Sequence, residues 1–458
     1  MTKLFASLLL FAPLHAAQPA DWIVTARWVV AMDAQHRVIE NGAVAIMGST
    51  IAAIGPRAEI EKRFTARRRL DRPGAALIPG LINTHTHAAM SLFRGIADDL
   101  ALQDWLEKFI FPAEAKNTSA EFVRWGTRLA VLEMLLSGAT TFCDMYYFEE
   151  VVAEVAKEAG MRGVLGETII GFPAPDAKTA EAALARTEAF FKKYAADPLV
   201  TPAVAPHAIY TNSDATLKAA RALAVRYSKP LLIHLSETRR ENDESIAKRG
   251  MSPTRALDAL GLFTGGLTVA AHGIWLDAAD IAILKQRGVG VAHCPSSNMK
   301  LASGVAPVDA LLAAGIPVGL GTDGPAGSNN DFNLLEELDL AGKLAKVTRN
   351  DPRVLPAQTL LEMATIGGAR VLGLDKTIGS IEAGKLADLV LIDLAQPHTT
   401  PAYNIYSTLV YAAKGSDVQD VMIHGKLVVR GRTSVTLNRD AILAKAAEYR
   451  ARIQTSLQ

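Results

Sequence analysis

The sequence predicts an α/β protein: a (β/α)8 TIM barrel with a small flanking β-sandwich domain formed from both chain ends. Apolar runs of strand length alternate with amphipathic stretches whose apolar residues recur three and four positions apart, over about 250 residues. Segments rich in β-branched residues, with turn glycines between them, lie before and after this region. A chain of 458 residues is long enough for one barrel with additions.

The two chain ends predict the flanking domain. Residues 22–32 and 42–55 are typical of short strands joined by a turn. Residues 379–393 and 417–432 show the same strand and turn pattern. We therefore expect a composite β domain from residues 18–75 and 375–435, a barrel over 76–374 and a C-terminal helix within 436–458.

Eight segments between these ends predict the barrel strands. Fully buried parallel strands should be continuous apolar runs, and such runs occupy residues 76–87, 139–145, 162–169, 200–208, 230–237, 267–273, 289–295 and 317–324. Helical periodicity separates them, for instance over 119–138 and 214–228.

Composition narrows the function and the location. The formal net charge of +1 gives no global field for nucleic acid or an anionic membrane, so we expect a small-molecule partner. Residues 1–17 resemble a signal peptide, with an apolar run too short to span a bilayer, and predict a periplasmic or secreted protein, or a cytoplasmic one if the leader is not functional. Cys143 and Cys294 lie in apolar runs and are expected to be buried free thiols.

His85 and His87 end the first predicted barrel strand. Residues i and i+2 of a strand share a face, so both imidazoles point the same way. Active sites of such barrels lie at the carboxyl ends of the strands, where two converging imidazoles suit a metal such as zinc. Alone, the pair is only suggestive, because single histidines are commonly structural.

Further polar residues mark the ends of the later strands. The barrel brings such residues to one mouth, and they are His207, His234, His272, His293 and Asp323. Three imidazoles and a carboxylate, from His85, His87, His234 and Asp323, would bind zinc and leave a position for an activated water. Glu237, three residues after His234, would carry a proton, or else satisfy N–H groups at a helix start.

The motifs resemble those of a known family. "PGLINTHTHAAMSLFRGIADDL", "HLSET", "AAHGIWLD", "HCPSSNMKLASGVAP" and "GTDGPAGSNN" are similar to the amidohydrolase superfamily, in particular its 5-methylthioadenosine/S-adenosylhomocysteine deaminases, from about Trp22 to Arg430. The resemblance implies one divalent metal per subunit on the four ligands named above, with zinc expected and Fe2+ or Mn2+ as alternatives. Strand four ends without the lysine that bridges two metals in other superfamily members.

The resemblance also implies roles for single residues. Glu237 and Asp323 would carry protons, and His272 would hydrogen-bond the attacking hydroxide. Glu114 would bind the ribose hydroxyls and His207 would contact the same sugar, the alternatives being a surface helix charge and a core histidine. We interpret His293 as supporting structure.

One position departs from the family. Its members often carry an arginine after strand three for the substrate's ribose or amino-acid tail, whereas this chain has Glu167 near that place and Arg162 earlier in the strand. A carboxylate there would disfavour the tail of S-adenosylhomocysteine.

These observations predict a metal-dependent deaminase of 5'-methylthioadenosine, S-adenosylhomocysteine or both, with adenosine as a further candidate, producing the inosine derivative and ammonia. The alternatives are hydrolysis of another heteroaromatic substrate (guanine, pterin or chlorotriazine) and a metal-binding relative without turnover. We expect a nucleoside substrate, neither nucleic acid nor membrane as a partner, and leave a homo-oligomer open.

Overall fold

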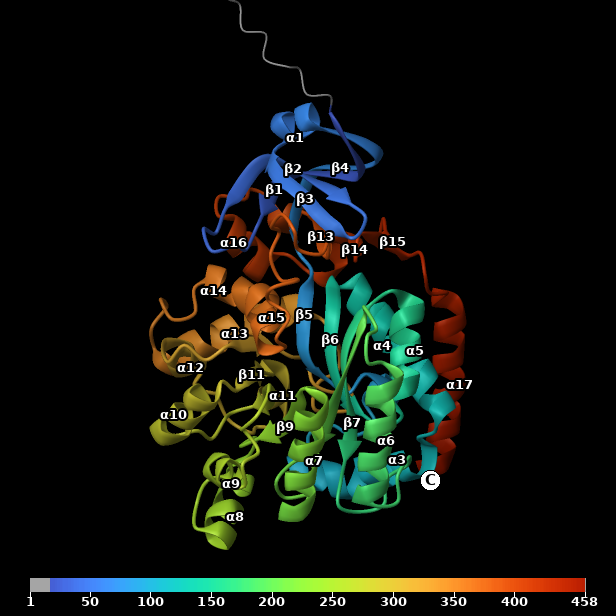
Figure 1. The fold of residues 1–458 in the computed structure, drawn as a ribbon, viewed down its shortest axis with the longest axis vertical. Coiled ribbons are helices and arrows are strands. Elements are labelled where there is room, and N and C mark those ends of the chain that lie inside the picture. The colour runs from blue at the N-terminus through green and yellow to red at the C-terminus, as the bar shows by residue number, and fades with distance from the viewer. Residues whose placement is uncertain (1–16, 458) are drawn as a thin grey trace, which may run out of the picture.

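The computed structural model describes residues 17–457 and contains a parallel barrel beside a separate sheet (Figure 1). The barrel strands follow one another in chain order. They are β5 (Leu81–Thr86), β6 (Ala139–Tyr146), β7 (Arg162–Ile169), β8 (Val200–Pro206), β9 (Leu231–Leu235), β10 (Thr268–His272), β11 (Gly290–His293) and β12 (Val318–Leu320). A parallel bridge between Thr86 and Asp323 closes the ring. The predicted fold class is confirmed.

Helices surround the strands as the outer layer of the barrel (Figure 1). Those that follow the barrel strands are α2 (Leu102–Asp104), α3 (Phe111–Asn117), α4 (Ala120–Leu136), α5 (Glu149–Ala159), α6 (Ala180–Lys193), α7 (Asp214–Tyr227), α8 (Arg239–Arg249), α9 (Pro253–Ala259), α10 (Ala278–Arg287), α11 (Pro295–Lys300), α12 (Val308–Ala313), α13 (Leu334–Arg349), α14 (Ala357–Glu362) and α15 (Gly368–Val371). The closing helix α17 (Arg439–Leu457) lies against α4, where Tyr449 meets Phe122 edge to face with ring centroids 5.7 Å apart.

The separate sheet contains strands from both chain ends. Its order is β16-β15-β14-β13-β4-β1-β2-β3. The strands are β1 (Gln18–Val30), β2 (Val38–Met47), β3 (Thr50–Pro56), β4 (Phe64–Pro79), β13 (Leu389–Asp393), β14 (Val418–Ile423), β15 (Lys426–Arg430) and β16 (Thr433–Ser434), with α1 (Arg57–Arg63) and α16 (Ile405–Ser407) in the connections. The two halves meet where β4 pairs antiparallel with β13, with Ile78 opposite Val390.

The predicted first barrel strand, residues 76–87, is in fact two strands. Its first part belongs to β4 of the flanking sheet, and β5 of the barrel begins at Leu81. Gly80 makes the transition: its N–H donates to the Asp388 carbonyl at 2.9 Å, and a Cβ there would collide with Thr140. The apolar run is continuous because both strands are buried, so hydrophobicity alone does not reveal the break.

A buried ion pair joins the barrel to the flanking sheet. Arg162 starts β7 and its Nη2 lies 3.1 Å from Asp388 Oδ2, while its Nη1 donates to the Pro198 carbonyl at 2.9 Å. Both side chains are almost fully buried, at 7% and 2% exposed. Each charged group compensates the other for the water that both lose on burial between the barrel and the flanking sheet.

We expect Arg162→Met to lower the free energy of unfolding by about 3 kcal/mol, because it leaves the Asp388 carboxylate buried without its cation. The matched control is Arg124→Met, which removes the exposed pair with Glu154 and should cost about 0–1 kcal/mol. Urea denaturation of both variants measures the difference. A loss no greater than that of the control would contradict a stabilising role for the pair.

Three further predictions concern single features of the chain. Nearly all of the predicted leader, residues 1–17, lies outside the described residues. Within residues 17–457, no helix combines the length and apolar character needed to cross a membrane. Cys143 and Cys294 are buried free thiols, as predicted.

Candidate active site

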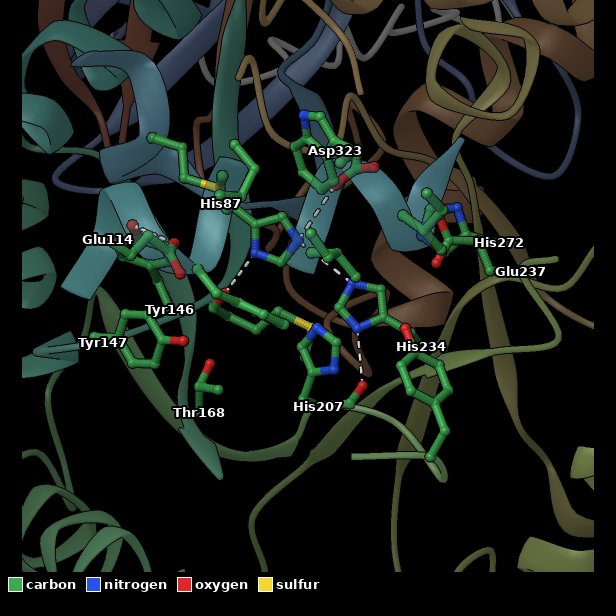
Figure 2. Close-up of a pocket in the computed structure, with 18 residues that line it drawn as sticks. His87, Glu114, Tyr146, Tyr147, Thr168, His207, His234, Glu237, His272 and Asp323 are labelled. Atoms are coloured by element: carbon green, nitrogen blue, oxygen red, sulfur yellow. Dashed lines mark hydrogen bonds and ion pairs between the residues drawn. The ribbon is translucent and has the colours of Figure 1, made fainter. Parts of the chain in front are cut away.

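The carboxyl ends of the barrel strands surround a pocket. Seven of the eight predicted site residues line it, together with apolar side chains of the segment 88–117 that follows β5 (Figure 2). The eighth, His85, is buried beside it, 3% exposed. The barrel therefore brings together residues that are up to 238 positions apart in the chain, counted from His85 to Asp323.

Five of these residues, among them the four predicted ligands, form a cluster suited to a metal ion. One ligand atom each from His85, His87 and Asp323 lies within 4.8 Å of the others, and His85, His234 and His272 form a second such group. The Nε2 atoms of His87 and His234 are 3.3 Å apart. His85 Nε2 is buried and makes no hydrogen bond. A buried imidazole nitrogen without a partner, among two further imidazoles and a carboxylate, fits a divalent metal such as zinc.

Backbone carbonyls orient two of these imidazoles. His87 Nδ1 lies 2.6 Å from the Met145 carbonyl, and His234 Nδ1 lies 2.8 Å from the His207 carbonyl. A carbonyl oxygen can only accept, so each Nδ1 must carry the proton. In the neutral form of each ring, Nε2 is then unprotonated and faces the cluster, and this is the form that binds metals.

Asp323 faces the same cluster as an ionised carboxylate. Its Oδ1 lies 3.4 Å from His85 Nε2 and 3.3 Å from His87 Nε2. Burial alone would raise the pKa of Asp323, but the two imidazoles hold it well below its ordinary value. Ser297 Oγ donates to Oδ2 at 2.7 Å and the Gly324 N–H donates to Oδ1 at 2.7 Å, which fix the carboxylate.

Glu237 and His272 face each other at the edge of the cluster. Glu237 Oε1 is 3.8 Å from His272 Nε2, and His272 Nδ1 lies 3.0 Å from Asn298 Oδ1. Burial raises the pKa of Glu237, which favours a carboxyl group able to hold a proton and to release it. Backbone φ is +72° at His272 and +62° at Asp323, a left-handed conformation that costs non-glycine residues energy and is frequent at functional sites.

Glu241, a residue that the sequence analysis did not identify, positions Glu237. Its buried carboxylate accepts from the N–H groups of Ser236 at 3.1 Å and Glu237 at 2.8 Å, across a turn in which Ser236 has φ of +49°. A carboxylate on the first turn of α8 would ordinarily be interpreted as a helix-start charge. Here it closes the turn that aims Glu237 into the pocket.

We expect Glu241→Ala to lower kcat about 10- to 100-fold while zinc content stays near that of the wild type, because the turn loses its acceptor and Glu237 its position. Glu244→Ala, on the exposed face of the same helix, is the control. Steady-state kinetics and metal analysis separate the effects. A kcat equal to that of the control would show that Glu241 does not position Glu237.

Glu114 and His207 line the same pocket at different places: Glu114 lies on the side away from Glu237 and His272, and His207 lies beside His234, with ring centroids 4.7 Å apart (Figure 2). Glu114, on α3, is buried and accepts a hydrogen bond from Tyr146 Oη at 2.7 Å. Burial raises the pKa of Glu114 to about 7, although the tyrosine acts in the opposite direction. His207 follows β8, and its Nδ1 lies 3.2 Å from Thr211 Oγ1. Both side chains reach the pocket, which excludes a surface charge for Glu114 and a core position for His207.

A lid covers the pocket with apolar side chains. It is the segment between β5 and α4, and its apolar pocket residues are Met90, Leu102, Trp105, Leu106, Ile110 and Phe111. Trp105, in the π-helical segment η2 (Trp105–Ile110), donates from Nε1 to the Ala326 carbonyl at 3.0 Å and so ties the lid to the loop after β12. Tyr146, Tyr147 and Thr168 also line the pocket and were missed from the sequence. Their strands were predicted, but a strand pattern does not show which side chain faces a ligand.

The expectation for Glu167 is wrong. This residue is fully buried behind β7 and does not line the pocket. Its carboxylate accepts from the Glu149 N–H at 3.0 Å and from Arg186 Nε at 3.0 Å. Because successive side chains of a strand alternate between faces, Thr168 points into the pocket instead. His293 is buried outside the pocket, consistent with supporting structure.

Comparisons with known proteins agree with this geometry. The model of the Amidohydrolase family matches residues 76–428. A protein of Syntrophus aciditrophicus named 5-methylthioadenosine/S-adenosylhomocysteine deaminase 1 is 48% identical over 96% of this chain and 98% of its own length. A zinc-bound adenosine deaminase from Xanthomonas campestris superposes with a TM-score of 0.94 at 42% identity, covering 96% of this chain and all of that one. A zinc complex of an atrazine chlorohydrolase from Arthrobacter aurescens TC1 gives 0.85 at 25% identity, covering 93% and 99%.

Proposed function

The chain belongs to the amidohydrolase family, and from that premise we propose that it is a metal-dependent deaminase of 5'-thio-substituted adenosines and adenosine. One observation carries the proposal: a single pocket is lined by the His–Asp cluster, Glu237, Glu114 and His207. The cluster suits hydrolysis at an aromatic carbon, and a buried carboxylate and an imidazole that line the same pocket suit the hydroxyls of a ribose. The products are the inosine derivative and ammonia.

The metal that fits this chain is zinc, one ion held by His85, His87, His234 and Asp323. When bound, such an ion supplies an activated water and stabilises negative charge at the reacting carbon. The chlorohydrolase and the adenosine deaminase of similar fold both carry zinc. Binding of a single ion agrees with β8, which ends in Pro206 and His207 without a lysine.

The protein residues then have distinct tasks. Asp323, kept ionised, accepts the proton that the attacking water loses. Glu237 gives a proton to the neighbouring ring nitrogen of adenine and regains one from the oxygen at C6 as the carbonyl forms, while Asp323 passes the proton that it accepted to the leaving amino group. His272 donates to the oxygen as it gains charge at C6. The carbon–nitrogen bond breaks, and ammonia leaves with the protons that these groups have transferred.

Ammonia release and ultraviolet change test the proposal directly. The purified, zinc-loaded protein is assayed with 5'-methylthioadenosine, S-adenosylhomocysteine, adenosine and guanine side by side. We expect conversion of adenosines to their inosine counterparts and none of guanine. Activity on guanine or a chlorotriazine with none on adenosines would assign the cluster to a different heteroaromatic substrate.

We expect Glu114→Ala to lower kcat/KM for an adenosine at least about 100-fold, because a buried acceptor for the ribose hydroxyls is lost. Glu107→Ala, on the exposed face of the same lid, is the control. The same measurement on a free base distinguishes the two kinds of substrate. Equal losses on nucleoside and free base would show that Glu114 does not recognise the sugar.

A further inference from the structure

We propose that the pocket selects against substrates whose 5'-substituent carries a carboxylate, so that methylthio-type tails are preferred to amino-acid tails. This inference rests on the proposed function and concerns the part of the substrate beyond the ribose. The described residues that line the pocket include three carboxylates, Glu114, Glu237 and Asp323, and neither lysine nor arginine. A substrate carboxylate would lose its water there and gain no cationic partner.

We infer the place of the tail from the arrangement of the pocket. Adenine C6 must reach the cluster beside Glu237 and His272, and the ribose must reach Glu114. Figure 2 shows Tyr147 and Thr168 on the Glu114 side of the pocket, away from Glu237 and His272. The 5'-substituent therefore extends toward a phenol and a hydroxyl, which are neutral groups.

The chain does carry a cation behind this wall, but it is committed to other groups. Arg186, on α6, lies 3.0 Å from Glu167, 2.8 Å from Glu150 and 3.6 Å from Asp176. These three carboxylates surround its guanidinium. Because Glu167 is on the face of β7 opposite to Thr168, the ion pairs hold Arg186 away from the pocket.

The apolar lid strengthens the discrimination. Phe111 and Ile110 line the pocket on the same segment as Glu114, and Trp105 ties that segment to the loop after β12. A tail inside this enclosure has little water to solvate its charge. A methylthio group has no charge to solvate and gains apolar contact.

The test compares three substrates that differ only in the tail: 5'-methylthioadenosine, 5'-S-(3-aminopropyl)-5'-thioadenosine and S-adenosylhomocysteine. The second is the third without its carboxylate. We expect kcat/KM for the first two to agree within about fivefold and that for S-adenosylhomocysteine to be at least about 30-fold lower. Equal kcat/KM values for the last two substrates overturn the proposal, whether both values are high or both are low. The carboxylate would then have no effect on kcat/KM, and any difference from 5'-methylthioadenosine would come from the length of the tail. Lack of turnover of all three is a failure of the proposed function itself.

A charge added to the wall gives an independent test. Thr168→Lys places a cation where the tail should lie, and Thr168→Met places a chain of similar length without charge. We expect the lysine variant alone to raise the kcat/KM ratio of S-adenosylhomocysteine to 5'-methylthioadenosine, by about tenfold or more. An unchanged ratio in a lysine variant that still deaminates 5'-methylthioadenosine overturns the proposal. If neither variant folds, the substrate comparison on the wild type decides.

Discussion

Glu237→Gln should lower kcat about 1,000-fold while the protein keeps its metal and its fold. Glutamine has the shape of glutamate but cannot transfer a proton. General acid–base catalysis typically contributes a factor of about 10²–10⁴ to the rate. Glu237 faces His272 at 3.8 Å and makes no contact that would require it as a metal ligand. Turnover of 5'-methylthioadenosine, zinc content and thermal unfolding together measure the effect.

The control for this change is Glu244→Gln, an exposed glutamate on α8. It should behave as the wild type in all three measurements. A Glu237→Gln protein with kcat within threefold of the wild type would remove the proton-carrying role. Identical absence of turnover in wild type and variant, across a panel of purines, would instead identify a metal-binding relative without catalysis.

Asp323→Asn should abolish both metal binding and turnover. The amide is neutral, so it binds a divalent metal weakly and accepts no proton. The neighbouring His85 and His87 also lose the charge that faces them at 3.4 and 3.3 Å. We expect zinc content to fall well below one ion per chain and kcat to fall at least about 1,000-fold.

Ser297→Ala is the matched comparison for Asp323. It removes only the hydroxyl that donates to Oδ2 at 2.7 Å and leaves the carboxylate in place. Its loss of activity should be about 10- to 100-fold, in the range of residues that orient metal ligands. Full zinc content and full activity in Asp323→Asn would contradict a place for this carboxylate in the metal site.

Residues whose position depends only on strand order were predictable. A parallel barrel places all strand ends at one mouth, so His85, His234 and Asp323 meet there whatever the loops between them do. The eight apolar runs were long enough to identify their strands. The break at Gly80 was not visible, because burial on both sides of it produces one continuous apolar run.

Residues whose position depends on a loop or on strand phase were not predictable. Glu241 reaches Glu237 across a turn with a left-handed residue, and no periodicity announces such a turn. Glu167 and Thr168 are neighbours in the sequence and point to opposite faces of β7. A shift of one residue in the assumed phase of the strand therefore exchanges the side chain that faces the pocket with the one that faces away from it. That phase decides which side chain faces the pocket, and the structure places Thr168 there instead of Glu167.

The pairing of β4 with β13 has a consequence for synthesis on the ribosome. About 310 residues separate Pro79 from Leu389, which corresponds to roughly 15 to 60 s of translation at about 5–20 residues per second. During that interval the edge of β4 that later pairs with β13, at Leu77 and Ile78, has no strand beside it, although β1 can pair with the other edge. An unpaired apolar edge is a template for aggregation. The end of the chain thus protects an edge made near its beginning, and nascent chains that stall before β13 should depend on chaperones that shield strands.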